Sequence, residues 1–394
     1  MNQRRHLLQT AAGCVASALA APWPLAALAQ AGGVSPDAVL RQYGALVHAA
    51  YGDSLAGGQT LQTAVQAFVA APAADTLAAA RRAWLAARDA YGQTEAFRFY
   101  GGPIDDDKGP EGRLNSWPLD EAYIDAVQGK PNAGLVNDPR IVISKANLAR
   151  LNEKGGEENI AAGWHAIEFL LWGQDQSETG PGARSFEDFV DGKAPNAARR
   201  RQYLAVVSEL LVDDLRYLVV AWAPGARNYR ARFEAGGLES LRKMIVGLGS
   251  LSRGELAGER MEVALNTQDQ EDEHSCFSDN THRDIVANAL GIENVWLGRL
   301  KRVDGSELQG PSLRDLVAAR DATLAARATQ QMAASVAAAR AIQAPFDREI
   351  IGGKDAPGRQ RMQKTIDSLV QQSKDLVDAA AAIGITRLSL VNPK

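Results

Sequence analysis

The sequence predicts an all-α protein built from two antiparallel helical bundles. Alanine is abundant and runs of β-branched residues are scarce, a balance that favours helices over strands. Apolar residues recur at spacings of three and four, and the alternation typical of a strand is nowhere sustained. The chain has 394 residues, enough for two domains with a sizeable core.

The first apolar stripe opens at Leu46, Val47 and Tyr51 and continues through Leu61, Val65 and Phe68. The next predicted helix, 76–100, ends at a Gly-Gly-Pro sequence that cannot continue a helix. Further helices are predicted over 118–128, 140–152, 157–173, 198–221, 237–250, 255–275, 282–300, 312–342 and 358–384.

We predict an N-terminal bundle over residues 30–228 and a C-terminal bundle over 229–394. Residues 94–99 (TEAFRF) and 272–277 (DEHSCF) are weakly alike, and both come late in a predicted helix. This likeness suggests that the two bundles arose by internal duplication.

Composition limits the classes of partner. The chain is 46% hydrophobic and 23% charged, as in ordinary globular proteins, and its formal net charge is −4. Because it lacks a basic tract, we expect no nucleic-acid partner. Beyond the first thirty residues no apolar run is long enough for a transmembrane helix, while membrane docking stays open.

The N-terminus predicts export. Arg4 and Arg5 precede an apolar stretch from Leu7 to Leu28, and a small-x-small sequence ends at Ala29. We therefore predict that residues 1–29 are a cleaved export signal and that the mature protein is periplasmic or otherwise exported. The paired arginines fit a twin-arginine signal, and an ordinary secretory signal fits as well.

The most informative motif is GWHAIE, residues 163–168. His165 and Glu168 are three residues apart and so share one helix face, where they can bind a cation together or form a buried hydrogen bond. Gly163 lets a neighbouring helix or a ligand approach closely. This is not the His-Glu-x-x-His motif of zinc proteases, and a catalytic zinc needs a third protein ligand from elsewhere.

A second candidate segment is 91–105 (YGQTEAFRFYGGPID). Glu95 and Arg98 share a helix face, and Asp105 follows in a loop that can turn back over the helix end. Glu95 and Asp105 offer hard oxygen ligands, with Arg98 holding a carboxylate in place. The alternative is a surface ion pair between Glu95 and Arg98, which contributes little to stability.

The third segment, 266–284 (NTQDQEDEHSCFSDNTHRD), holds two histidines and six carboxylates. Glu271/His274 and Asp279/His282 each repeat the three-residue spacing of carboxylate and histidine. These groups are either metal ligands or the charged end of one helix and the cap of the next.

Together the three segments resemble the imelysin-like family, the group of insulin-cleaving metalloproteinases and iron-regulated protein A. Residues 163–168 match its Gly-x-His-x-x-Glu signature, and 268–284 look most like the iron-regulated branch. The resemblance implies two helical bundles related by duplication, a site between them, and an exported bacterial protein connected to iron or to peptidase activity.

The resemblance transfers residue roles to this chain. His165 and Glu168 carry over directly, and Glu95, Arg98 and Asp105 carry over as neighbours of the site. The predicted metal ligands are His165, Glu168, Glu95 and Asp105, and the predicted lining residues are Gly163, Arg98, Asp279 and His282.

The preferred functional hypothesis is binding of a metal ion, with iron favoured and zinc possible, in iron acquisition. Its expected partners are the metal ion and components of iron uptake. A zinc-type metallopeptidase acting on a peptide substrate, with Glu168 or Glu95 as base, is the first alternative. A peptide-binding or glycan-binding module without an essential metal is the second.

Overall fold

The computed structural model describes residues 33–177 and 179–390. The predicted export signal lies outside these residues. The regular secondary structure of the described residues is helical apart from a small antiparallel hairpin of β1 (Arg299–Lys301) and β2 (Glu307–Gln309). The prediction of an all-α fold is confirmed.

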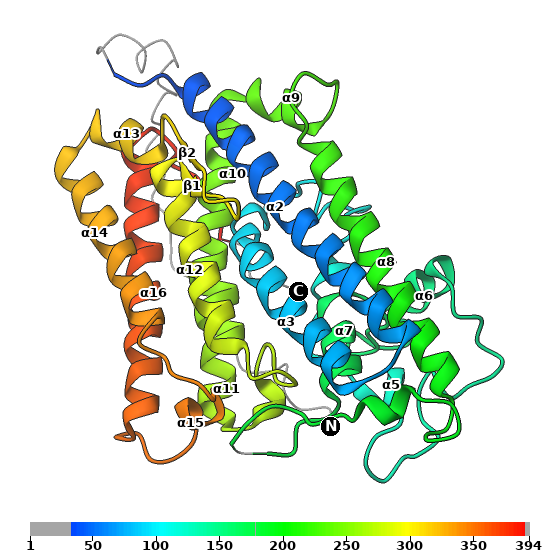
Figure 1. Ribbon diagram of the computed structural model, residues 1–394. Coiled ribbons are helices and arrows are strands. Elements are labelled where there is room, and N and C mark those ends of the chain that lie inside the picture. Colours follow the sequence, from blue (N-terminus) through cyan, green and yellow to red (C-terminus); the bar gives the residue numbers. More distant parts are fainter. Residues whose placement is uncertain (1–32, 178, 391–394) are drawn as a thin grey trace.

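Three long helices dominate the N-terminal half: α2 (Pro36–Ala70), α3 (Ala74–Gly92) and α8 (Ala197–Ala221). Ser35 caps α2 by accepting from the Ala38 N–H, and Pro36 occupies its first turn. Helix α7 (Gly163–Trp172) packs against α3 and α8 near their lower ends in Figure 1. Shorter elements complete this half: η1 (Gln93–Phe97), α4 (Glu111–Leu114), α5 (Glu121–Ile124), α6 (Lys145–Leu151) and η2 (Phe186–Phe189).

The C-terminal half is built around α10 (Gly237–Ser250), α12 (Thr281–Leu297), α14 (Ala322–Ala339) and α16 (Pro357–Ala382). Figure 1 shows them side by side, from yellow-green through red. Helix α10 continues without a break into the π-helical segment η3 (Leu251–Glu262) and then into α11 (Val263–Thr267). The remaining elements are α9 (Tyr229–Glu234), η4 (Gln270–Asp272), α13 (Leu313–Ala318) and α15 (Asp347–Ile350).

The two groups of helices contact each other along their length. Helix α12 packs on α3 and η1, and α10 packs on α2. The predicted boundary at 228/229 falls between α8 and α9, yet Phe233 of α9 stacks on Tyr43 of α2 with ring centroids 5.0 Å apart. The domain boundary and the internal duplication stay predictions.

Several predicted helix limits are wrong. Of the predicted helix 118–128 only α5 forms, because the backbone of Asp125 is extended. The predicted helix 157–173 begins at Gly163, whose φ of 92° cannot continue a helix from upstream. The segment 312–342 divides at Asp321, whose side chain accepts from the Leu324 N–H and starts α14.

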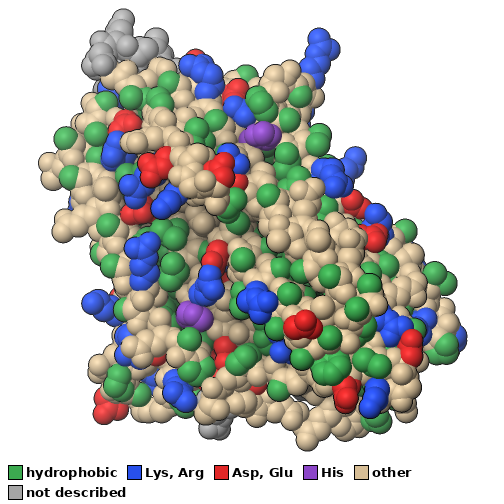
Figure 2. All heavy atoms as spheres, viewed as in Figure 1, with side chains coloured by type: hydrophobic (Ala, Val, Ile, Leu, Met, Phe, Trp, Pro, Cys, Tyr) green, Lys and Arg blue, Asp and Glu red, His purple; other side chains and the backbone are tan. Residues whose placement is uncertain are grey.

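The described helices include none that is both long and apolar enough to cross a membrane. On the face shown in Figure 2, positively and negatively charged side chains are interspersed.

Candidate functional site

Helix α7 carries the central motif through the core. All ten of its residues are buried, and the Trp84 indole N–H donates to the Trp164 carbonyl at 3.0 Å. At Gly163 a Cβ atom would lie 2.5 Å from the carbonyl oxygens of both Arg113 and Leu114. The positive φ and this close approach explain why glycine starts the helix.

His165 and Glu168 form a hydrogen bond inside the core. His165 Nδ1 and Glu168 Oε2 are 2.9 Å apart, and both side chains are buried. The other carboxylate oxygen, Oε1, accepts from the backbone N–H of Ser278 at 3.0 Å and from its hydroxyl at 2.7 Å. The loop before α12 therefore anchors the carboxylate that orients His165.

A second histidine is held in the same way. His274 Nδ1 lies 2.7 Å from Asp284 Oδ2, which also accepts from the Ser275 hydroxyl at 2.6 Å. The buried guanidinium of Arg88 donates to this Asp284 oxygen at 3.1 Å and to the Asn115 side chain at 2.6 Å. The Asn280 side chain donates to Oδ1 at 3.3 Å, so the Asp284 carboxylate has four donors and orients His274.

The two imidazole rings lie close together in an edge contact. The ring centroids of His165 and His274 are 4.8 Å apart with the planes at 73°. In each ring Nδ1 is engaged by a carboxylate, while Nε2 is buried and has no hydrogen-bond partner among the described residues. This pairing of Nδ1 with a carboxylate is also common among histidines that ligate metals.

Burial keeps both imidazoles neutral at physiological pH. It lowers the pKa of His165 well below its usual value, and the nearby His274 lowers it further. Burial and Arg260 lower the pKa of His274 to about 4. A neutral imidazole has a lone pair for a metal, and binding requires no proton loss from it.

The two carboxyl groups differ in charge state. Burial raises the pKa of Glu168 to about 8 despite the hydrogen bonds from Ser278. Burial also acts to raise the pKa of Asp284, but Arg88 and the hydrogen bond from His274 hold it well below its usual range. Asp284 is therefore ionised at neutral pH, while Glu168 is largely protonated in the absence of a cation.

Glu95 lies in a separate cluster of buried charges. Its Oε2 atom accepts from Arg98 at 2.6 Å and from Arg260, in the π-helical segment, at 2.7 Å. Burial acts to raise the pKa of Glu95, but the two guanidinium groups lower it to about 2. Arg98 also pairs with Glu111 at 2.8 Å, so the predicted surface pair is an interior network.

Asp105 stabilises a turn. Its carboxylate accepts from the backbone N–H groups of Phe99 and Gly102, the latter at 2.8 Å. The structure therefore does not bring Asp105 together with His165 and Glu168 through any hydrogen bond among the described residues.

Asp279 and His282 do not pair through the carboxylate. His282 Nδ1 lies 3.0 Å from the Asp279 backbone carbonyl oxygen. The Asp279 carboxylate instead meets Asp175 and Asp347, with one oxygen of each within 4.8 Å of the others. Of the sequence-predicted residues, only His165 and Glu168 thus contact each other at the imidazole pair.

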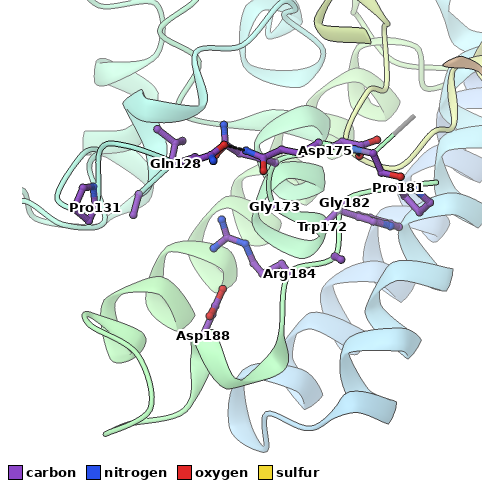
Figure 3. A pocket seen from close by; sticks show the side chains of 15 residues that line it. Gln128, Pro131, Trp172, Gly173, Asp175, Pro181, Gly182, Arg184 and Asp188 are labelled. Atoms are coloured by element: carbon purple, nitrogen blue, oxygen red, sulfur yellow. Dashed lines mark hydrogen bonds between the residues drawn. The ribbon is translucent and has the colours of Figure 1, made fainter. Parts of the chain in front are cut away.

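A depression of about 630 Å³ lies beside this region. It is lined by the loop that follows α7, and Figure 3 shows Gln128, Asp175 and Arg184 along its wall. Neither His165 nor Glu168 lines it.

The sequence-predicted set omits His274, Asp284, Arg88 and Ser278. His274 and Asp284 lie in segment 266–284, whose content of histidines and carboxylates indicated a site. The expected partner of His274 was Glu271, three residues away, but His274 pairs with Asp284. Nothing in the sequence around Arg88 indicates a role at the site, since it is one of several arginines in an alanine-rich helix.

Comparisons with known proteins agree with the motifs. A sequence model of the Imelysin family (Peptidase_M75) matches residues 47–376. The chain is 28% identical over 305 residues to iron-regulated protein A of Synechococcus elongatus, an alignment that covers 75% of this chain and 72% of that protein.

Two crystal structures share the fold. One is an iron-regulated protein A precursor from Parabacteroides distasonis, with a TM-score of 0.68, 20% identity and coverage of 88% of this chain and 95% of that one. The other is an imelysin-like protein from Psychrobacter arcticum, with a TM-score of 0.62, 16% identity and coverage of 89% and 97%.

Proposed function

Because the chain belongs to the imelysin family, we propose that it binds a metal ion through the imidazoles of His165 and His274 and serves iron acquisition. Glu168 and Asp284 act in this proposal as the carboxylates that orient the two rings. Glu95 and Asp105 are left out of the ligand set, because two arginines and two backbone N–H groups already engage them.

The observation that carries the proposal is the pair of buried Nε2 atoms without partners. Buried polar atoms without hydrogen bonds are rare in folded proteins, because each one loses its bond to water and gains nothing in return. A metal ion bound by both lone pairs would remove this cost. The ring centroids are 4.8 Å apart, so in this proposal both rings are close enough to bind the same ion.

Iron is the preferred metal. Imidazole ligands suit iron and zinc alike. The relative from Synechococcus elongatus is named iron-regulated protein A, and this favours iron. A bound cation would also favour the ionised form of Glu168, so we expect metal binding to release a proton near neutral pH.

Burial favours metal binding over peptide hydrolysis. His165, Glu168 and His274 are at most 2% exposed. Hydrolysis requires the reacting groups to reach a polypeptide, whereas a small ion needs only a narrow path. Hydrolysis of an unfolded peptide, abolished by chelator and restored by zinc, would overturn this preference.

The test is a metal titration of the full mature chain, purified without an affinity tag. We expect near-stoichiometric Fe²⁺ binding under anaerobic conditions, lost in the His165→Ala/His274→Ala variant. The control is His48→Ala, which removes a half-buried histidine of α2 near Arg230 and Arg302. Unchanged affinity in a folded double variant would contradict the proposal.

Export is a second part of the proposal. It is supported by the sequence pattern over residues 1–29 and by the precursor from Parabacteroides distasonis that shares the fold. Sequencing the N-terminus of protein from the periplasmic fraction should find Gln30 first. An intact N-terminus in the cytoplasmic fraction alone would contradict export.

A further inference from the structure

Three aspartates from distant parts of the chain converge next to the imidazole pair. Asp175 comes from the loop after α7, Asp279 from the loop before α12, and Asp347 is the first residue of α15. One carboxylate oxygen of each lies within 4.8 Å of the others, and the three residues are 3–6% exposed.

A fourth carboxylate adjoins this cluster. Glu273 is completely buried, and neither of its carboxylate oxygens has a hydrogen-bond partner among the described residues. The charges that act on it most strongly are those of Asp347, Asp279 and Asp175. An unpartnered carboxylate buried beside three others is a strong indication of a missing positive charge.

The carboxyl groups of this cluster lie close enough together for their negative charges to repel one another. Burial, reinforced by Asp347 and Asp175, raises the pKa of Asp279 to about 8. A bound cation would offset this repulsion.

The surrounding backbone is held by contacts that need no cation. The Gln270 side chain donates to the Asp175 carbonyl at 2.7 Å, and the Gly182 N–H donates to the Phe277 carbonyl at 2.9 Å. On the other side, the Gly352 N–H donates to the Gln268 side chain at 2.9 Å. The carboxylates are therefore placed together by the fold before any ion binds.

We propose that Asp175, Asp279 and Asp347, with Glu273 beside them, bind a hard divalent cation of the calcium type. The donors are all carboxylate oxygens, which suit calcium and magnesium, and calcium accepts six to eight oxygens in irregular geometry. Asp175 also lines the depression in Figure 3, so this edge of the cluster lies next to solvent. The site differs in chemistry from the imidazole pair.

The test is calorimetric titration of the chelator-treated full mature chain with CaCl₂ and, separately, with MgCl₂. We expect calcium to bind more tightly than magnesium, and the Asp175→Asn/Asp347→Asn variant to lose at least about tenfold in calcium affinity. The control pair, Asp106→Asn/Asp107→Asn, removes the same charge from an exposed loop and should bind as the native chain does.

Two further variants test the site, one inside the carboxylate cluster and one at the imidazole pair. Glu273→Gln removes one buried charge at nearly constant volume and should also weaken calcium binding. The His165→Ala/His274→Ala variant should retain calcium binding, so failure of the iron proposal and failure of this one are distinguishable. No calcium or magnesium binding at millimolar concentration, or equal affinity in folded Asp175→Asn/Asp347→Asn, would overturn the site.

Discussion

Ser278 donates two hydrogen bonds to a single oxygen of Glu168, from its backbone N–H and from its hydroxyl, across 110 residues of sequence. This contact fixes the loop before α12 on the central helix α7. Through Glu168 it also fixes the ring of His165. A residue outside the GWHAIE motif thus controls the orientation of the motif's histidine.

Ser278→Ala should therefore destabilise the folded protein chiefly at high pH. The lost hydroxyl bond goes to a carboxylate that is ionised above about pH 8, where such a bond contributes about 1.5–3 kcal/mol. We expect a smaller loss at pH 6, where Glu168 is protonated. Urea unfolding at both pH values measures the difference, with Ser278→Thr as the control that keeps the hydroxyl. Equal losses at both pH values would contradict this account.

The buried ion pair of Arg88 and Asp284 predicts strong coupling between α3 and α12. Arg88→Met leaves the Asp284 carboxylate without its cation and should cost about 3–5 kcal/mol of unfolding free energy. Adding Asp284→Asn removes the isolated charge, so the double variant should be more stable than Arg88→Met alone. A double-mutant cycle by chemical denaturation measures this coupling. Additive losses would show that the two residues act independently.

Gly163 should tolerate no side chain. Gly163→Ala combines a positive φ with a Cβ atom 2.5 Å from two backbone oxygens, so it should cost more than about 3 kcal/mol. The matched control is Gly129→Ala, which has a φ of 77° and nothing within 4 Å of the new Cβ. Strain alone should cost it about 1–2 kcal/mol. Thermal unfolding that finds equal losses would assign the whole effect to backbone strain.

Local features of the sequence predict much of the fold and, of the two neighbouring histidines, His165. Apolar spacing reveals the long helices, and the three-residue spacing of His165 and Glu168 survives as a 2.9 Å hydrogen bond. The three-residue spacing does not identify the partner of His274, because Asp284 lies beyond the turn that precedes α12.

The remaining site residues depend on tertiary contacts. Asp347 lies in a four-residue helix with no motif around it, and it joins Asp175 and Asp279 only because α15 packs beside α11. Glu95 and Arg98 have the spacing of a weak surface pair. In the fold both are buried, and Arg260 from the π-helical segment forms a second ion pair with Glu95.

The chelator-treated protein should lose stability as the pH rises from about 6.5 to 8. The pKa values of Glu168 and Asp279 are about 8 in the folded state, against 4.5 and 3.8 for the free side chains. Below about pH 6.5 the buried histidines, which are neutral in the folded chain and protonated in the unfolded chain, oppose this trend. Above pH 6.5 the folded chain binds more protons than the unfolded chain, so the free energy of unfolding falls with pH and levels off above 8. Urea unfolding at half-unit pH steps measures the slope.

Asp279→Asn should make this decline shallower, because an amide does not titrate. The exposed variant Asp106→Asn should leave it unchanged. Below pH 4 the sign reverses, since Glu95 and Asp125, both with a folded pKa of about 2, lose their stabilising arginine pairs as they are protonated. Stability should therefore be greatest at an intermediate pH, between these two declines. A chelator-treated native chain whose stability is constant from pH 6.5 to 8 would show that the buried carboxyl groups are already neutralised by something the chelator does not remove.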